Sequence, residues 1–113
     1  MGYPIATGMT ISTASYTKTA NLVLNRNQFL PKGRLVLVAK GSAIGMNIIL
    51  NVGGVALCDD LAIPNFGATG TLSPKDNVVI DQVIAGGVCE FFLRNTTNGA
   101  LTTDYSLFFE PMK

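Results

Sequence analysis

The sequence "RLVLVAKGSAIGMNIILNVGGVALC", residues 34–58, decides the fold, because it either crosses a membrane as one helix or breaks into several β-strands. A spanning helix needs about 20 mostly apolar residues, usually with basic or aromatic flanks. The longest uncharged run, residues 41–58, lacks such flanks and contains Asn47 and Asn51. Glycines separate "RLVLVAK", "MNIILNV" and "VALC" where turns are needed. The stretch therefore predicts three short strands and no transmembrane helix.

The rest of the chain carries the same pattern. Short runs rich in Val, Ile, Leu, Thr and Phe alternate with Gly, Pro and Asn clusters, and no apolar helical spacing persists over three turns. With 113 residues the chain suffices for one domain and not for two. We therefore predict an all-β domain, residues 1–113, folded as a single antiparallel β-sandwich with jelly-roll-like, meander or Greek-key topology. The expected strands cover residues 9–17, 19–25, 34–40, 46–52, 54–58, 77–85, 88–95 and 100–110.

The C-terminal part of the chain predicts a hairpin. Residues 88–95 and 100–110 are both strand-like and are separated by a loop at residues 97–99. A three-residue loop, with Gly99 in the left-handed position of a G1 bulge, keeps the apolar side chains on one face. A two-residue turn would mix the faces. We therefore expect these two segments to pair through the longer loop.

A second hairpin is expected at Gly86 and Gly87, where a two-residue turn would pair residues 77–85 with 88–95. That register places Arg94 between two carboxylates, on the face away from the core and beside two exposed aromatic rings. The other residues of this cluster are Asp81, Asp104, Phe92 and Phe108. The simplest interpretation is a surface ion pair that fixes the register, worth about 0–1 kcal/mol. The alternative is a contact patch for a partner or a surface glycan.

Two apolar residues in the expected loop at residues 58–71 are further contact candidates. Leu61 and Phe66 lie in a segment that Pro64 and Gly67 punctuate. Such side chains either fix the loop to the edge of the sandwich or contact a ligand or partner at its tip.

The central strands are apolar at both parities, in "LVLVA" and again in "NIIL". An antiparallel strand with one solvated face should alternate instead. A single sandwich has only one interior layer, and exposed apolar surface usually marks a contact. We therefore expect a neighbouring subunit to cover an outer face, as in a homo-oligomer.

Catalytic chemistry is not indicated. The chain has no histidine, so Ser-His-Asp and Cys-His arrangements are excluded and the commonest general base is missing. Cys58 and Cys89 do not have the spacing of a metal site, and we predict two buried free thiols, with a single disulfide as the alternative. Asp59 and Asp60 are adjacent loop carboxylates without EF-hand spacing. We expect no catalytic residue, no metal and no cofactor.

Charge and targeting signals narrow the possible partners. The net charge is +1 with no basic run, which argues against nucleic acid. The N-terminal residues lack the basic and apolar regions of a signal peptide. Residues 95–97, "NTT", match a glycosylation sequon, which we interpret as chance because no secretory signal accompanies it.

The segments "LVLVAKGSAIGMNIILNVGG" and "NTTNGALTTDYSLFFEP" accompany a low content of charged residues and the absence of His and Trp. In these features the whole chain resembles small jelly-roll-like structural proteins of bacteriophages and other viruses. The resemblance implies a non-enzymatic capsid, penton, spike-base or decoration protein, made in the host cytoplasm and contacting other subunits of the virion. The alternative from a different class is a small carbohydrate- or ligand-binding β-sandwich. Its contacts would come from Phe92, Arg94, Asp104, Phe108, Leu61 and Phe66.

Overall fold

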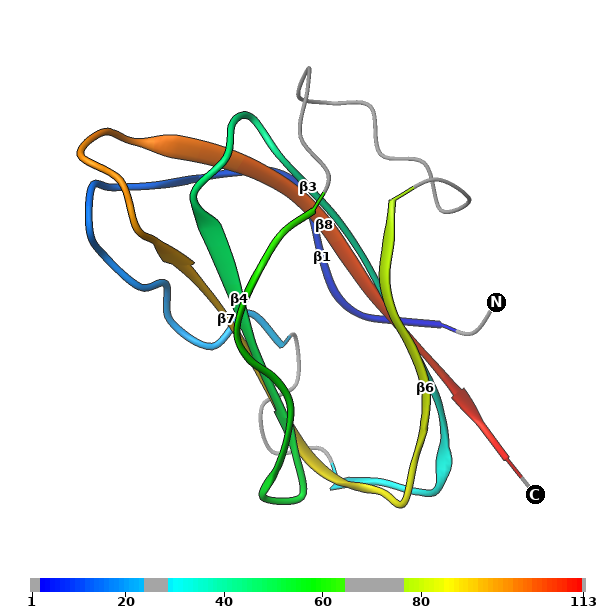
Figure 1. Cartoon of the computed structure of the whole chain (residues 1–113). Helices are drawn as coiled ribbons and strands as arrows, with labels where there is room; N and C mark the ends of the chain where they lie inside the picture. Colours follow the sequence, from blue (N-terminus) through cyan, green and yellow to red (C-terminus); the bar gives the residue numbers. More distant parts are fainter. Residues whose placement is uncertain (1–2, 24–28, 65–76, 113) are drawn as a thin grey trace.

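The computed structural model describes residues 3–23, 29–64 and 77–112, which form strands and no helix (Figure 1). The strands are β1 (Tyr3–Thr13), β2 (Phe29–Leu30), β3 (Gly33–Gly41), β4 (Met46–Val52), β5 (Val55–Ala62), β6 (Val78–Ile84), β7 (Gly87–Asn95) and β8 (Leu101–Pro111). The predicted all-β class and the division of residues 34–58 into three strands are confirmed. Within the described segments there is accordingly no helix with the length and hydropathy to span a membrane.

The strands form two antiparallel four-stranded sheets, in the order β1-β8-β3-β6 and β2-β7-β4-β5. Strand β1 pairs with β8, β2 with β7, β3 with β6, and β4 with β5, as in one long antiparallel ribbon. The ribbon is wound so that β3 also pairs with β8 and β4 with β7. This winding is the jelly roll, one of the three topologies that the sequence left open. Figure 1 shows the two layers, with β4 and β7 facing the layer that contains β1, β8, β3 and β6.

Both expected hairpins are wrong. Strands β6 and β8 lie in one sheet and β7 lies in the other, so both connections cross between the sheets. Gly86 and Gly87 have φ angles of 110° and 130° and form the crossover from β6 to β7. Gly99 is not among the residues with positive φ, so no left-handed G1 bulge forms there. The hairpin predictions pair consecutive strands, whereas among the described strands only β4 and β5 are both consecutive and paired.

The expected strand at residues 19–25 is also wrong in its described part. Residues 19–23 run along the edge of β7, and two side-chain oxygens take the place of backbone acceptors. Thr19 Oγ1 accepts the N–H of Leu93 at 3.1 Å, and Asn21 Oδ1 accepts the N–H of Phe91 at the same distance. The segment therefore covers the edge of β7 without continuing the ladder.

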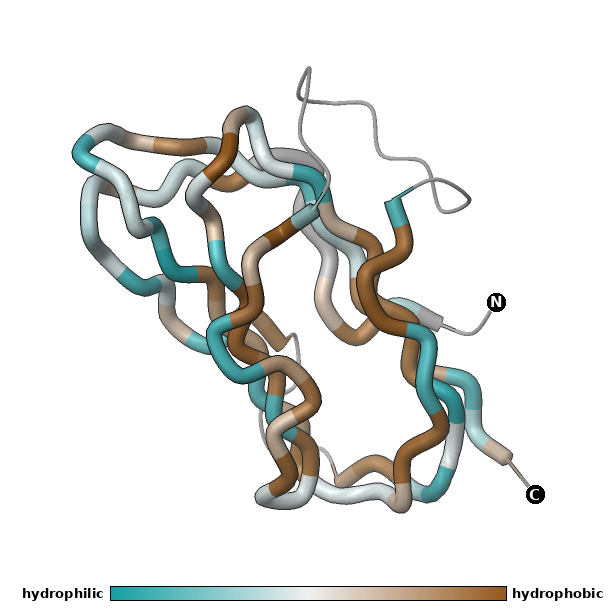
Figure 2. The backbone as a smooth tube through the Cα atoms, viewed as in Figure 1, coloured by the Kyte–Doolittle hydropathy of each residue, from teal (hydrophilic) through white to brown (hydrophobic). Residues whose placement is uncertain are grey.

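The core fills the space between the sheets. Its largest fully buried side chains include Phe91, Leu93, Leu107 and Phe109. Phe91 meets Tyr105 edge-to-face across the two layers, with ring centroids 5.4 Å apart. Figure 2 shows hydrophobic residues along the strands of both layers, whereas the loop between β7 and β8 is polar or neutral.

The double apolar parity of β3 has an explanation within the chain. Leu35 and Leu37 point into the core, whereas Val36 and Val38 fall outside the core cluster and face the opposite side of the sheet. Val36 and Val38 are nevertheless only 5% and 0% exposed within the single chain. No second subunit is needed to bury these two valines. Coverage by a neighbouring subunit stays a prediction, and the exposed edges of the sheets become the surface to consider.

Candidate functional site

The six predicted contact residues do not form one cluster. Phe92 and Arg94 lie on β7, whereas Asp104 and Phe108 lie on β8 in the other sheet. Leu61 is exposed on β5. Phe66 lies outside the described residues, so its predicted contact role is not placed by the structure.

Arg94 does form an ion pair, but with a different carboxylate. Its Nε donates to Asp60 Oδ1 at 2.9 Å, and its Nη2 donates to Asp60 Oδ2. Asp60 has a left-handed φ of 59°, next to a register shift between β4 and β5, and Asn47 donates to the same Oδ1 at 3.2 Å. The bulge turns the carboxylate toward the outer face of this sheet. The hydrogen bonds from Arg94 lower the pKa of Asp60.

The predicted partner of Arg94 is engaged elsewhere. Asp81 on β6 accepts from Arg34 on β3, with Nε–Oδ1 at 2.6 Å, and these bonds lower the pKa of Asp81. The sequence contained a signal for Asp60, because a strand continuing past Cys58 brings it beside β4. Ending that strand at residue 58 concealed the pair. Both ion pairs are solvent-exposed and mainly fix register.

The Phe92 ring is already in contact with a cation. Lys18 Nζ lies 4.6 Å from the ring centroid, a cation–π geometry. The backbone of Lys18 forms an isolated antiparallel bridge with Arg94, which places this lysine beside β7. Across the β7–β4 pairing, Phe92 is the register partner of Ile49. A sugar stacking on this ring would have to displace Lys18.

The residues predicted on β8 do not offer a polar contact to solvent. Asp104 is fully buried and stands opposite Lys40 of β3 in register. Phe108 is half-buried between Val36 of β3 and Pro4 of β1. Both side chains lie on the outer surface of their sheet, and their contact role stays a prediction.

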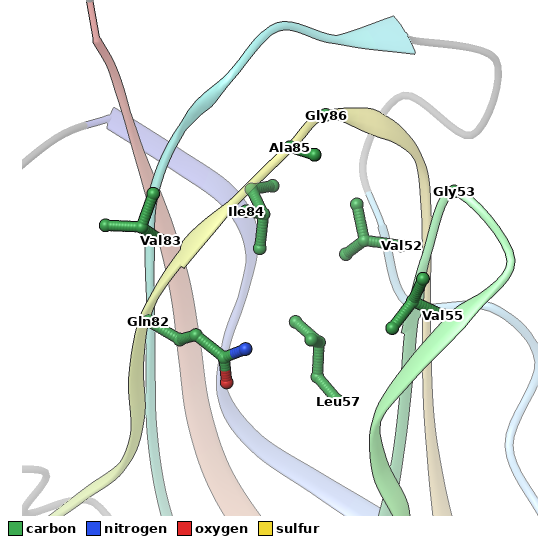
Figure 3. A pocket seen from close by; sticks show the side chains of 9 residues that line it. All are labelled: Val52, Gly53, Val55, Leu57, Gln82, Val83, Ile84, Ala85 and Gly86. Carbon is green, nitrogen blue, oxygen red and sulfur yellow. The ribbon is translucent and has the colours of Figure 1, made fainter.

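An apolar cleft of about 260 Å³ lies between the edge strands β5 and β6 (Figure 3). Val52, Val55 and Leu57 reach in from one sheet, and Gln82 and Ile84 from the other. The remaining lining residues are Gly53, Val83, Ala85 and Gly86. Val55 is 61% exposed, although its register partner Val52 faces the core. Among the described residues that line the cleft, Gln82 has the one polar side chain and none is titratable, so this lining suits an apolar side chain.

Neither cysteine is a reactive nucleophile. Cys58 and Cys89 are free and buried, which confirms the predicted free thiols. Burial raises the pKa of Cys58 to about 11 and that of Cys89 to about 12, so the reactive thiolate is scarce at neutral pH. In the described part of the chain, no three His, Cys, Asp or Glu side chains gather closely enough to hold a metal ion.

The sequon at Asn95 is occupied by internal hydrogen bonds. The side chain is fully buried, and Nδ2 donates to the carbonyl oxygens of Thr13 and Gly99 at 3.0 and 2.7 Å. Its Oδ1 accepts from the backbone N–H and the hydroxyl of Thr97. The folded chain does not present this amide for modification, in keeping with the interpretation as chance.

The comparisons with protein-family models, with curated proteins and with solved structures returned no match to this chain. Its function must therefore be argued from its own surfaces and their chemistry.

Proposed function

We propose that this protein is a non-enzymatic structural subunit that associates with itself through its β-sheets in a repeating assembly, as a component of a virion. The observation that carries the proposal is the open side of the sandwich between β5 and β6. An apolar cleft there adjoins two strands at the edges of their sheets, and Val55 and Val83 expose more than half of their surface. Exposed apolar surface that lines a cleft, as at Val55, usually marks a contact between proteins.

The virion context rests on analogy of fold. Jelly rolls occur in viral capsid proteins and also in lectins and cupins, and a fold alone does not select among functions. The local chemistry favours a structural role, because the thiols are protonated and both exposed ion pairs serve to fix register. Carbohydrate binding at Phe92 is less favoured, because Lys18 already lies over the ring.

Light scattering of the purified protein over a concentration series tests self-association. We expect a defined oligomer, or larger regular particles that electron microscopy can image. A strict monomer at every concentration, together with binding on a glycan array, would favour the carbohydrate-binding alternative. The virion assignment has a separate test, since the gene should lie beside genes for packaging, assembly or lysis.

A further inference from the structure

The four sheet edges of the sandwich differ in how they are protected. Natural proteins block edge pairing with short strands, bulges, prolines and charged residues. Strand β2 has two residues; β1 has two register shifts and Pro4; and β5 has two register shifts and adjacent Asp59 and Asp60. Strand β6 has seven residues, no proline or lysine, and one irregularity, at its Val78 end. Its single charge, Asp81, is neutralised by Arg34.

The direction of the backbone groups on β6 follows from β3. The N–H of Ala39 donates to the carbonyl oxygen of Asn77 at 3.0 Å, so Ala39 directs its backbone groups toward the β6 side. Alternate residues of a strand point the same way, and β3 is regular throughout its pairing with β8. Leu35 therefore also bonds to β6, where its register partner is Gln82. Its chain neighbours, Asp81 and Val83, consequently turn their N–H and C=O groups away from β3, toward the side of β6 where no described strand pairs with it.

We infer that β6 pairs antiparallel with β6 of a second copy of this chain, around a two-fold axis at Gln82, so that two β1-β8-β3-β6 sheets become one. In this register Asp81 and Val83 exchange backbone hydrogen bonds with Val83 and Asp81 of the second copy. Gln82 lies opposite Gln82 of the second copy as a pair without backbone bonds. The paired segment, residues 80–84, avoids the irregular end of the strand. The inference rests on the proposed self-association and specifies where it occurs.

Charge selects this register over its neighbours. An axis at Asp81 would place two carboxylates directly opposite each other, which is destabilising. An axis at Val83 would pair only residues 82–84. With the axis at Gln82, each Asp81 lies opposite Val83 of the second copy. Within its own chain, Val83 is paired with Arg34 of β3. The two Asp81 carboxylates are then diagonal neighbours instead of directly opposed, and each keeps its ion pair with Arg34 of its own chain.

The same register covers the apolar cleft. On the inner face, Ile84 lines the cleft and would stand opposite Ile80 of the second copy. That isoleucine extends apolar cover beside the exposed Val55. Pairing over five residues spans about 17 Å, which is short for an interface that must hold alone. The contact therefore suits one of several in a repeating assembly.

Val83→Pro tests the edge. The N–H of Val83 faces away from β3, so proline removes a donor that the monomer fold does not use, as in natural edge strands. We expect the variant to keep the circular dichroism spectrum of the wild type and to raise the dissociation constant at least tenfold by light scattering. Val83→Thr, which keeps the N–H, should associate like the wild type. Val88→Lys, on the outer face of β7, serves as a control for association through a sheet face.

Cross-linking tests the register. Gln82→Cys should give a disulfide-linked dimer with oxidised glutathione, because opposed residues without backbone bonds bring their Cβ atoms close together. Asp81→Cys should not, since the two positions are offset by two residues. Cys58 and Cys89 are buried and do not compete. A dimer linked at residue 81 and not at residue 82 would overturn the proposed axis.

The two proposals fail in different ways. An oligomeric wild type that Val83→Pro leaves intact and that Gln82→Cys does not link would overturn the edge contact, while self-association stands. Loss of association in Val88→Lys, with Val83→Pro unaffected, would move the contact to a sheet face. A monomeric wild type whose Gln82→Cys variant does not cross-link would overturn both proposals.

Discussion

At the scale of single residues, Asn95 shows how one buried amide can join three segments. It lies at the end of β7, donates to the last residue of β1 and to the β7–β8 loop, and accepts from that loop. All four hydrogen-bonding positions of the amide are used. The sequence marked this asparagine only as a sequon. Its structural role depends on carbonyl groups that become neighbours through folding.

Asn95→Asp should destabilise the protein strongly. The change places a carboxylate oxygen, which cannot donate, against the carbonyl oxygens of Thr13 and Gly99 in a fully buried site. An uncompensated buried charge costs about 3–5 kcal/mol, measurable by denaturant unfolding. Asn98→Asp is the matched control, because Asn98 is exposed and should shift stability by less than about 0.5 kcal/mol. Equal unfolding midpoints for the two variants would contradict this role for Asn95.

At the scale of elements, local patterns predicted the strands well and their partners poorly. The segments between glycines in residues 34–58 became β3, β4 and β5, because strand period and turn residues are local properties. Pairing depends on how the ribbon winds, and no local pattern records that. The pair Gly86 and Gly87 is compatible with a two-residue turn and with a crossover between sheets. The ion pair of Arg94 is predicted in kind but with the wrong carboxylate, because the predicted strand ends at residue 58 and leaves out Asp60.

The crossover between β6 and β7 depends on a close approach of two backbones. A Cβ on Gly87 would lie 2.4 Å from the Cα of Gly53, in the turn between β4 and β5, and Gly87 has a φ of 130°. Gly87→Ala should therefore cost more than about 3 kcal/mol in denaturant unfolding, through strain and displacement together. Gly54→Ala separates the two effects, since its φ is 82° but its Cβ would meet nothing within 4 Å. A smaller loss for Gly87→Ala than for Gly54→Ala would contradict the close approach.

At the scale of the whole molecule, the sandwich leaves its open side between β5 and β6 and places its titratable groups unevenly. The carboxylates with lowered pKa values, Asp60 and Asp81, are exposed in their ion pairs. Their contribution to stability is present above the pKa of an unfolded Asp and is lost as the pH falls through the lower folded values. Because water screens both pairs, acid should weaken the fold only slightly through them. The thiols are buried, so the larger dependence on pH is expected at the alkaline end.

The free energy of unfolding should fall as the pH rises through about 8.5, where an unfolded thiol is half ionised. Well below that pH, Cys58 and Cys89 are protonated in both states and contribute no pH dependence. Above it, the unfolded chain releases thiol protons that the folded chain retains, because burial raises the pKa of Cys58 to about 11 and that of Cys89 to about 12. The rising pH therefore stabilises the unfolded state relative to the folded state. The slope is at most about 1.4 kcal/mol per pH unit for each thiol. Urea unfolding of the wild type and of the Cys58→Ala/Cys89→Ala variant at several alkaline pH values measures it. The variant should be less stable near neutrality and show a flatter alkaline decline, whereas parallel curves would assign the decline to other groups, such as Tyr105, whose pKa burial also raises.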